Sequence, residues 1–312
     1  MNSVISPKKN VELADIIHKA VNAQQQGFLI ENPSHINIDE KYNVQHLLKL
    51  TKGLCLPEIT ILLESTNLRE YGLSSIKAGD LENGSLQIDA AAQKYNDKTL
   101  SREAIIVADS FQMAAEAYLQ YKQNDFSKAL NSLVNAIKAC NNLRDEYNYD
   151  VEIRRIHLAR NIVRVMAFND DQIGACLVAF KLLGYIQGAT ELWPFPNLTL
   201  TTQSDHLIKE EQWFLIDQIL AELSFLISIR NAKSSNLINM YYDILSNDMR
   251  CLYSEFEQVY LWLDAQHASV KGDHLDFLNR LITFYSGGSY HLPRAWKEIT
   301  LDFNSLFKLM YS

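Results

Sequence analysis

The sequence predicts an all-α protein, and three observations support this. Glycine and proline, which break helices, number only 11 and 6 in a chain of 312 residues, about half their usual share of roughly 12%. From about residue 101 to the end, apolar residues recur three and four positions apart, the period of a helix with one buried face. No segment shows the evenly spaced alternation that a sheet needs. We therefore expect stacked antiparallel helical hairpins.

Residues 1–100 are less regular than the rest and are expected to form a helical N-terminal cap or small domain. Glycine-containing stretches at 27–37 and 72–84 interrupt the helical pattern and are expected to be loops. The helices expected in this part are 11–25, 40–52, 56–65 and 86–96.

Residues 101–312 carry the stronger periodicity and are expected to form one continuous array of helical repeats. Some of these helices begin with a side chain that can accept hydrogen bonds from the first backbone N–H groups, as Ser101, Asp171 and Asp205 can. The helices expected in this part are 101–122, 126–143, 149–168, 171–187, 206–230, 234–250, 253–269, 273–285 and 294–310.

The clearest repeat signal lies between Ala114 and Ile137. Here an apolar helix pattern ends in the run Tyr121-Lys122-Gln123-Asn124-Asp125-Phe126, and small residues follow at Ala129 and Ala136. This pattern resembles a tetratricopeptide repeat, with Asn124 in place of the usual glycine. The resemblance implies a hairpin whose aromatic rings fill the space beside the turn, while the alanines let the two helices approach closely.

A second stretch of the same kind contains Lys271-Gly272-Asp273, although Phe277 stands where the family has alanine. A third similar turn lies at Phe168 to Asp171. The spacings between these turns exceed the 34 residues of the family's repeat. The predicted fold is therefore either a tetratricopeptide-like α-solenoid or an irregular helical bundle.

Composition and charge exclude several partners. The net charge of −8 disfavours duplex DNA and anionic membranes, which need a concentrated positive field. The first ten residues include Pro7, Lys8 and Lys9 and lack the apolar core of a signal peptide. No run of about eighteen uncharged apolar residues follows. We expect a cytoplasmic protein that binds neither nucleic acid nor membrane.

The cysteines are far apart and stand among apolar residues, so they match neither a zinc site nor a disulfide framework. They are expected to be reduced core residues. These are Cys55, Cys140, Cys176 and Cys251.

No sequence motif for catalysis is present: the chain lacks phosphate-binding glycine loops, metalloprotease motifs and nucleophile elbows. Two adjacent sets, Asp264 with His267 and His206 with Glu210, could each contribute to a carboxylate-bridged metal site. Their spacings differ, and the further carboxylates of such a site are missing. The sequence thus predicts no catalytic residue, no metal site and no cofactor.

A basic stripe on the helix expected at 149–168 is the candidate ligand-binding site. At about 100° per residue, its members share a third of the helix circumference, opposite Ile156, Ala159, Val163 and Met166. Such a stripe can hold an acidic peptide or a carboxylate. Alternatively, it is a solvated face paired with Asp145, Glu146 or Glu152. The stripe consists of Arg154, His157, Arg160 and Arg164.

The expected function is that of an adaptor or scaffold that binds a protein or an acidic peptide in a groove of helical hairpins. A helical-bundle enzyme, possibly metal-dependent and acting on a small molecule, is the alternative. A homodimer through exposed aromatic residues is a further possibility. The apolar loop at 193–197 is expected to pack on a neighbouring helix, the alternative being a lid over a ligand. The aromatic residues considered for the dimer are Trp193, Phe195, Tyr241 and Tyr242.

Overall fold

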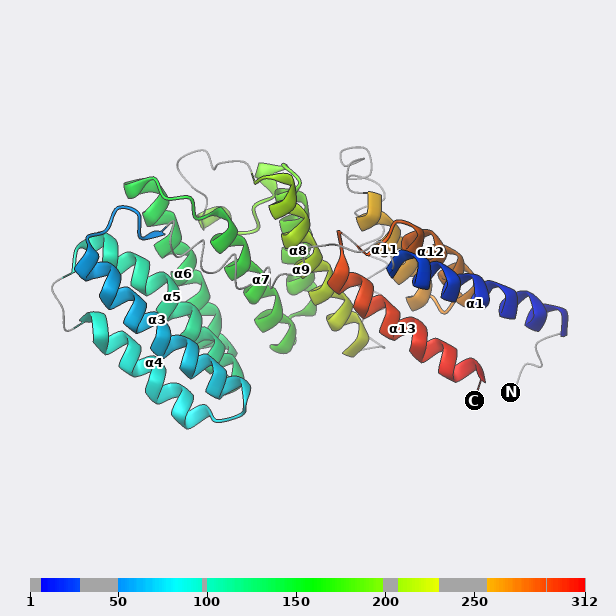
Figure 1. Cartoon of the computed structure of the whole chain (residues 1–312), viewed down its shortest axis with the longest axis horizontal. Coiled ribbons are helices and arrows are strands. Elements are labelled where there is room, and N and C mark those ends of the chain that lie inside the picture. The colour runs from blue at the N-terminus through cyan, green and yellow to red at the C-terminus, as the bar shows by residue number, and fades with distance from the viewer. Residues whose placement is uncertain are drawn as a thin grey trace. The chain divides into compact units, whose positions relative to one another are not determined.

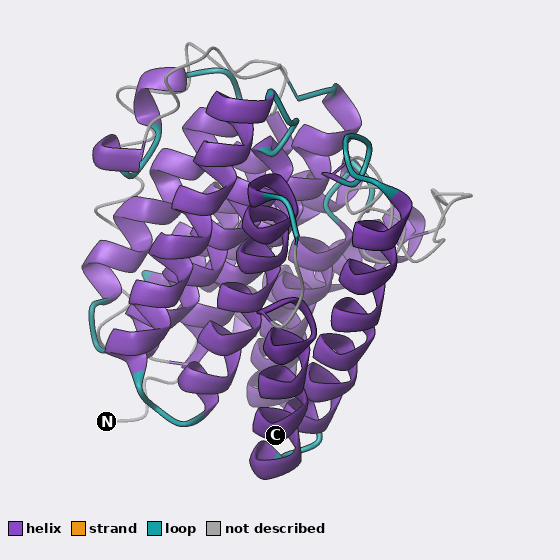
Figure 2. Ribbon diagram, turned by 90° about the vertical axis from the view of Figure 1, so that its left-hand side faces the viewer, coloured by secondary structure: helices purple, strands orange, loops and turns teal. Residues whose placement is uncertain are grey.

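A computed structural model describes the chain over most of its length. Within the described residues every regular element is a helix (Figure 2), which confirms the predicted all-α class. Contacts between Cα atoms define two compact units, which we name the central unit (His35–Ile208) and the terminal unit (Met1–Ser34 with Lys209–Ser312). The expected division at residue 100 stays a prediction. The described residues are 7–28, 50–96, 100–198, 207–229, 257–289 and 291–311.

The central unit consists of helical hairpins packed side by side (Figure 1). Helices α3 and α4, α5 and α6, and α7 and α8 form the pairs, and turns of three residues force the two helices of each pair to run antiparallel. Contacts of α5 with α3 and α4, and of α6 with α7, join the pairs into a stack, as predicted. The bounds are α3 (Leu56–Lys77), α4 (Leu81–Asn96), α5 (Arg102–Lys122), α6 (Phe126–Tyr147), α7 (Glu152–Phe168), α8 (Gln172–Ile186) and the short 3-10 helices η1 (Thr190–Leu192) and η2 (Pro196–Leu198).

The terminal unit contains a further hairpin, α11 with α12, against which α1 packs, and α9 packs on α13. Aromatic rings fill its core: Tyr285 lies 4.4 Å from Trp296 and 6.5 Å from Phe303, measured between ring centroids. The buried Asp217 of α9 accepts hydrogen bonds from the first backbone N–H groups of α13, which caps that helix. The bounds are α1 (Pro7–Phe28), α9 (Lys209–Ile229), α11 (Glu257–Val270), α12 (His274–Ser286) and α13 (Pro293–Tyr311).

One turn recurs in four of the described hairpins. A residue with positive φ ends the first helix, and an aspartate follows it. The aspartate N–H donates to the carbonyl five residues earlier, and its carboxylate accepts from the backbone N–H three residues later. The turn therefore satisfies both helix ends. The pairs are Gly79-Asp80, Asn124-Asp125, Asp170-Asp171 and Gly272-Asp273.

Three of these turns match the ones predicted from the sequence. The fourth, at Asp80, lies inside the stretch 72–84 that was expected to be a loop, and that expectation is wrong. Helix α3 runs through Gly72, and α4 runs through Gly84. A Cβ atom on Gly84 would lie 2.3 Å from Ile76 Cγ1, and one on Gly72 would lie 2.9 Å from the Gly84 carbonyl oxygen. These glycines mark a close crossing of two helices and do not interrupt them.

The packing expected around the α5–α6 turn is confirmed. The rings of Tyr121 and Phe126 lie 6.1 Å apart, and Phe168 of α7 meets Tyr121 edge-on at 5.4 Å. Ala129 and Ala136 are fully buried. The small residues therefore stand at the helix contact, and the rings cover the turn.

The expectation that the cysteines are core residues is only partly met. Cys140 and Cys176 are buried, whereas Cys55 is exposed at the start of α3. Cys55 therefore stands outside the core, a correction to the prediction. The remaining cysteine, Cys251, the predicted helix 234–250, most of the predicted helix 40–52 and the cap at Asp205 lie outside the described residues.

Candidate functional site

Helix α7 carries the predicted stripe and has two distinct sides. Ile156, Ala159 and Val163 are at most 1% exposed, so the predicted buried face is confirmed, although Met166 is partly exposed. The stripe is half-buried along its whole length, which distinguishes it from an ordinary solvated surface. Its residues are Arg154, His157, Arg160 and Arg164.

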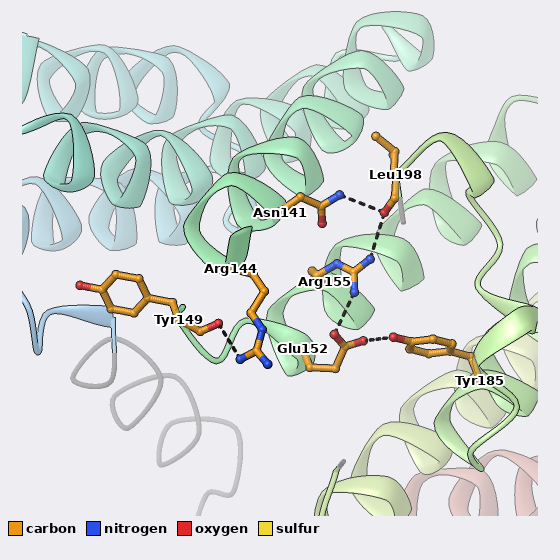
Figure 3. A network of polar contacts seen from close by, with 7 residues as sticks. All are labelled: Asn141, Arg144, Tyr149, Glu152, Arg155, Tyr185 and Leu198. Carbon is orange, nitrogen blue, oxygen red and sulfur yellow. Dashed lines mark hydrogen bonds and ion pairs between the residues drawn. The ribbon is translucent and has the colours of Figure 1, made fainter. Parts of the chain in front are cut away.

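A buried ion pair holds α7 against α8 on the side away from the stripe (Figure 3). Arg155 Nη1 lies 2.8 Å from Glu152 Oε2, and the two residues are only 1% and 3% exposed. The Tyr185 hydroxyl of α8 donates to the other carboxylate oxygen at 2.6 Å. Both oxygens of the buried carboxylate thus have partners, a condition for tolerating such a pair.

The same arginine fixes the loop that follows α8. Arg155 Nη2 and Asn141 Nδ2 both donate to the Leu198 carbonyl oxygen, at 3.0 and 2.9 Å (Figure 3). The Arg155 guanidinium also lies 4.2 Å from the ring centroid of Trp193. The loop therefore packs on the helices, as predicted. Trp193 is only 5% exposed, so it is not the exposed aromatic residue that the possible dimer contact required.

The stripe begins at Arg154, which lies against α5. Its Nη2 donates to the Ser110 carbonyl oxygen at 3.1 Å, and its guanidinium stands 4.3 Å from the ring centroid of Phe111. Arg69 of α3 stands 5.7 Å from the same centroid. Arg69 is 3% exposed and donates to the hydroxyls of Ser65 and Thr66, each at 2.7 Å.

Burial, aided by the positive charge of Arg154 and opposed by Tyr95 and Glu70, lowers the pKa of Arg69 to about 10. Burial likewise lowers the pKa of Arg154, and Cys140 and Glu70 act in the opposite direction. Both guanidinium groups are still protonated at neutral pH. Two cations thus share one aromatic ring between three helices.

The acidic partners expected for a solvated stripe are largely engaged elsewhere. Glu152 is bound by Arg155 and Tyr185, and Glu146 pairs with Arg102 at 2.8 Å. Further along the stripe, Arg160 Nη2 donates to the side chain of Asn161 at 3.4 Å.

Arg69 and Phe111 were not among the residues predicted for the site. They lie on α3 and α5, and no linear pattern connects them with α7. Only the stacking of the hairpins brings the three side chains together.

Of the two residue sets considered for a metal, one is paired within the protein. Asp264 of α11 lies 3.2 Å from Arg280 of α12, and His206 falls outside the described residues. Across the described part of the chain, no group of three or more His, Cys, Asp or Glu side chains could hold a metal ion. None of the described helices combines the length and apolarity needed to cross a membrane.

An open cavity of about 400 Å³ lies between the start of α5 and the α6–α7 turn. The Tyr149 hydroxyl donates to Glu103 Oε1 within it, and burial together with this carboxylate raises the pKa of Tyr149 to about 12. A tyrosine held protonated in this way is a poor base. The lining residues are Lys52, Gly53, Glu103, Tyr147, Asn148, Tyr149 and Asp150.

No protein-family model, no curated protein and no solved structure matches this chain.

Proposed function

We propose that this chain binds a partner protein by holding an acidic peptide segment against the central unit. The observation that carries the proposal is the half-buried basic stripe on α7. It continues onto α5 and α3, because Arg154 and Arg69 both stand against Phe111. Basic groups from α3 and α7, the first helices of two hairpins, thus meet on a ring of α5, the first helix of the hairpin between them.

Burial makes this stripe a better binding surface than exposed charges would be. The attraction between opposite charges is several times stronger near a protein surface of low effective dielectric than in water, whereas exposed ion pairs contribute little. Two of the expected internal acidic partners, Glu146 and Glu152, are already engaged.

The stripe is also held in place before any ligand arrives. On the opposite side of α7, Arg155 binds Glu152 and the Leu198 carbonyl oxygen, which joins α7 to the loop after α8. A site fixed in this way loses less conformational entropy on binding than a mobile one. For the alternative of a small-molecule enzyme, no specific observation among the described residues speaks in its favour.

The proposal is tested with two pools of fluorescently labelled decapeptides that differ only in charge. In the acidic pool, Glu and Asp alternate at the charged positions, and in the basic pool Lys occupies the same positions. Fluorescence anisotropy should show saturable binding of the acidic pool alone. The double variant Arg160→Ala and Arg164→Ala should weaken this binding by about tenfold or more, because each arginine can form charge-assisted bonds worth about 1.5–3 kcal/mol.

The matched control is Lys138→Ala with Lys181→Ala, which removes the same charge from exposed positions on α6 and α8. It should bind the acidic pool as the unmodified chain does. Equal weakening in both double variants would mean that only net charge matters, and the proposed site would be wrong. The same conclusion follows if the acidic pool does not bind saturably.

A further inference from the structure

We infer that Arg69, Phe111 and Arg154 form an oxyanion-binding site that receives a phosphate or carboxylate group of the bound ligand. This inference builds on the proposed function and names the chemical group that anchors the ligand. It rests on the geometry of the three side chains and on the partners that the two arginines lack.

The geometry places two cations around a single ring. Arg154 and Arg69 stand 4.3 and 5.7 Å from the centroid of Phe111, and they come from α7 and α3, on either side of α5 in the chain. A guanidinium packed on an aromatic ring is held in a defined plane. The ring therefore orients Arg154 while leaving its edge available for hydrogen bonds.

Neither arginine has a carboxylate partner among the described residues. The hydrogen bonds of Arg69 go to the hydroxyls of Ser65 and Thr66, and the described bond of Arg154 goes to the Ser110 carbonyl oxygen. Burying a charge without an opposite charge is costly.

The neighbouring arginine of α7 shows the contrast. Arg155 is as deeply buried as Arg69, and Glu152 lies 2.8 Å from it. The fold thus neutralises Arg155 internally, whereas Arg69 and Arg154 have no carboxylate partner among the described residues.

Arg154 keeps donors for a ligand. A guanidinium carries five N–H donors, and the described hydrogen bond of Arg154 uses one of them, on Nη2. Its Nε is buried without a hydrogen-bond partner and is not itself a contact for the ligand. Arg154 and Phe111 are both partly exposed, so a ligand can reach them, whereas Arg69 adds its charge from a buried position. The two charges repel each other, which an anion between them would relieve.

The charge of the site favours a doubly charged ligand. A phosphate monoester carries about −1.5 to −2 charges at pH 7 and three acceptor oxygens, and it matches two guanidinium groups better than a single carboxylate does. Glu70, an exposed carboxylate, acts on both arginines and opposes an incoming anion.

The test is a titration of the ¹⁵N-labelled full chain, in which the arginine Nε–H signals are followed by NMR at pH 7 and constant ionic strength. Inorganic phosphate and acetate are the two probes. The Arg154 signal, assigned by its absence from Arg154→Lys, should shift saturably with phosphate and more weakly with acetate. Because free anions are used, this result does not depend on peptide binding.

Three variants make the measurement decisive. Arg154→Lys keeps the charge but loses the planar fork, and it should weaken phosphate binding by about tenfold, followed in this variant through the Arg69 Nε–H signal. Glu70→Gln removes the opposing exposed carboxylate and should strengthen binding by about two- to fivefold. Arg102→Ala, the matched control, alters an exposed arginine of the same unit and should change nothing.

The outcomes separate this inference from the proposed function. Saturable phosphate or acetate binding that follows Arg154 and Glu70 supports the anion site, even if the acidic peptides fail to bind. Larger shifts with acetate than with phosphate would assign the site to carboxylates. If neither anion shifts the Arg154 signal saturably, or if Arg102→Ala weakens binding as much as Arg154→Lys does, the inference is overturned, whatever the peptides do.

Discussion

Breaking the buried ion pair of α7 should destabilise the central unit strongly. In Glu152→Gln, the Arg155 guanidinium keeps the Leu198 carbonyl oxygen and the ring of Trp193 but loses its only described counter-ion. Removing one partner of a buried pair typically costs about 3–5 kcal/mol, because the remaining charge stays buried. The pair is 1% and 3% exposed, so the upper part of this range is expected.

The reciprocal change, Arg155→Met, leaves the Glu152 charge with the Tyr185 hydroxyl as its described partner. Its cost should be of the same size, about 3–5 kcal/mol. The double variant leaves no buried charge, and the methionine fills most of the arginine volume. Its cost should therefore fall short of the sum of the single costs by about 2 kcal/mol or more.

Hydrogen exchange measured by mass spectrometry along a urea gradient is the suitable assay, because the chain has two compact units and a single unfolding curve need not be two-state. Peptides from α7 and from the loop 189–198 report the local free energy of opening. Peptides from α13 in the terminal unit are the internal control. Single variants that cost less than about 1 kcal/mol, or a double variant that costs the full sum, would refute the reasoning.

Three further predictions concern other parts of the fold. Gly84→Ala should lower the free energy of unfolding in urea by about 1–3 kcal/mol, because its Cβ would overlap Ile76. The control Leu86→Ala, at an exposed position, should change this free energy by no more than about 0.5 kcal/mol. Equal losses in the two variants would contradict the close helix crossing. Asp217→Ala should cost about 1–3 kcal/mol and speed amide exchange at the start of α13, which loses its cap; unchanged exchange there would argue against this capping. Burial raises the pKa of Asp302 from 3.8 to about 6, with a hydrogen bond from Gln266 acting against the rise and the charge of Glu298 adding to it. Between about pH 4 and pH 6 the folded state therefore holds a proton that the unfolded state has lost, and stability falls as the pH rises through this range. Asp302→Asn should therefore gain stability relative to the unmodified chain at pH 7 but not at pH 4, and a gain that is equal at both pH values would rule this explanation out.

The fold class and most helices could be predicted because they depend on local chemistry. The turns at Asp125, Asp171 and Asp273 were predictable from an aspartate that follows a residue able to take positive φ. The same turn is present at Asp80, but the glycines at 72 and 84 led to the prediction of a loop there. Glycine in an isolated helix is destabilising, and only the close approach of α3 and α4 shows why these two are needed.

The candidate site was predictable only in part, because some of its residues come from helices far from α7 in the sequence. Periodicity placed Arg154 on the partly exposed side of α7 and Val163 on the buried side, since both follow from 100° per residue. It could not supply Arg69 or Phe111, which reach Arg154 from other hairpins. Periodicity places Glu152 about 200° from Arg154 and thus away from the stripe, but it could not show which partners α8 and the following loop provide on that side.

Arg154 and Arg155 show most clearly where sequence reasoning ends. They are adjacent and chemically identical, and burial gives both an unfavourable desolvation energy. Arg155 turns toward the loop after α8, and Glu152 of the same helix lies 2.8 Å from it, so the fold itself stabilises its charge. Arg154 turns toward α5 and finds an aromatic ring and a carbonyl oxygen, neither of which carries an opposite charge. The two neighbouring arginines of α7 therefore have different roles: Arg155 stabilises the fold, and Arg154 can bind an anion. The measurable difference is that removing Glu152 should destabilise the protein, whereas supplying phosphate should stabilise it through Arg154.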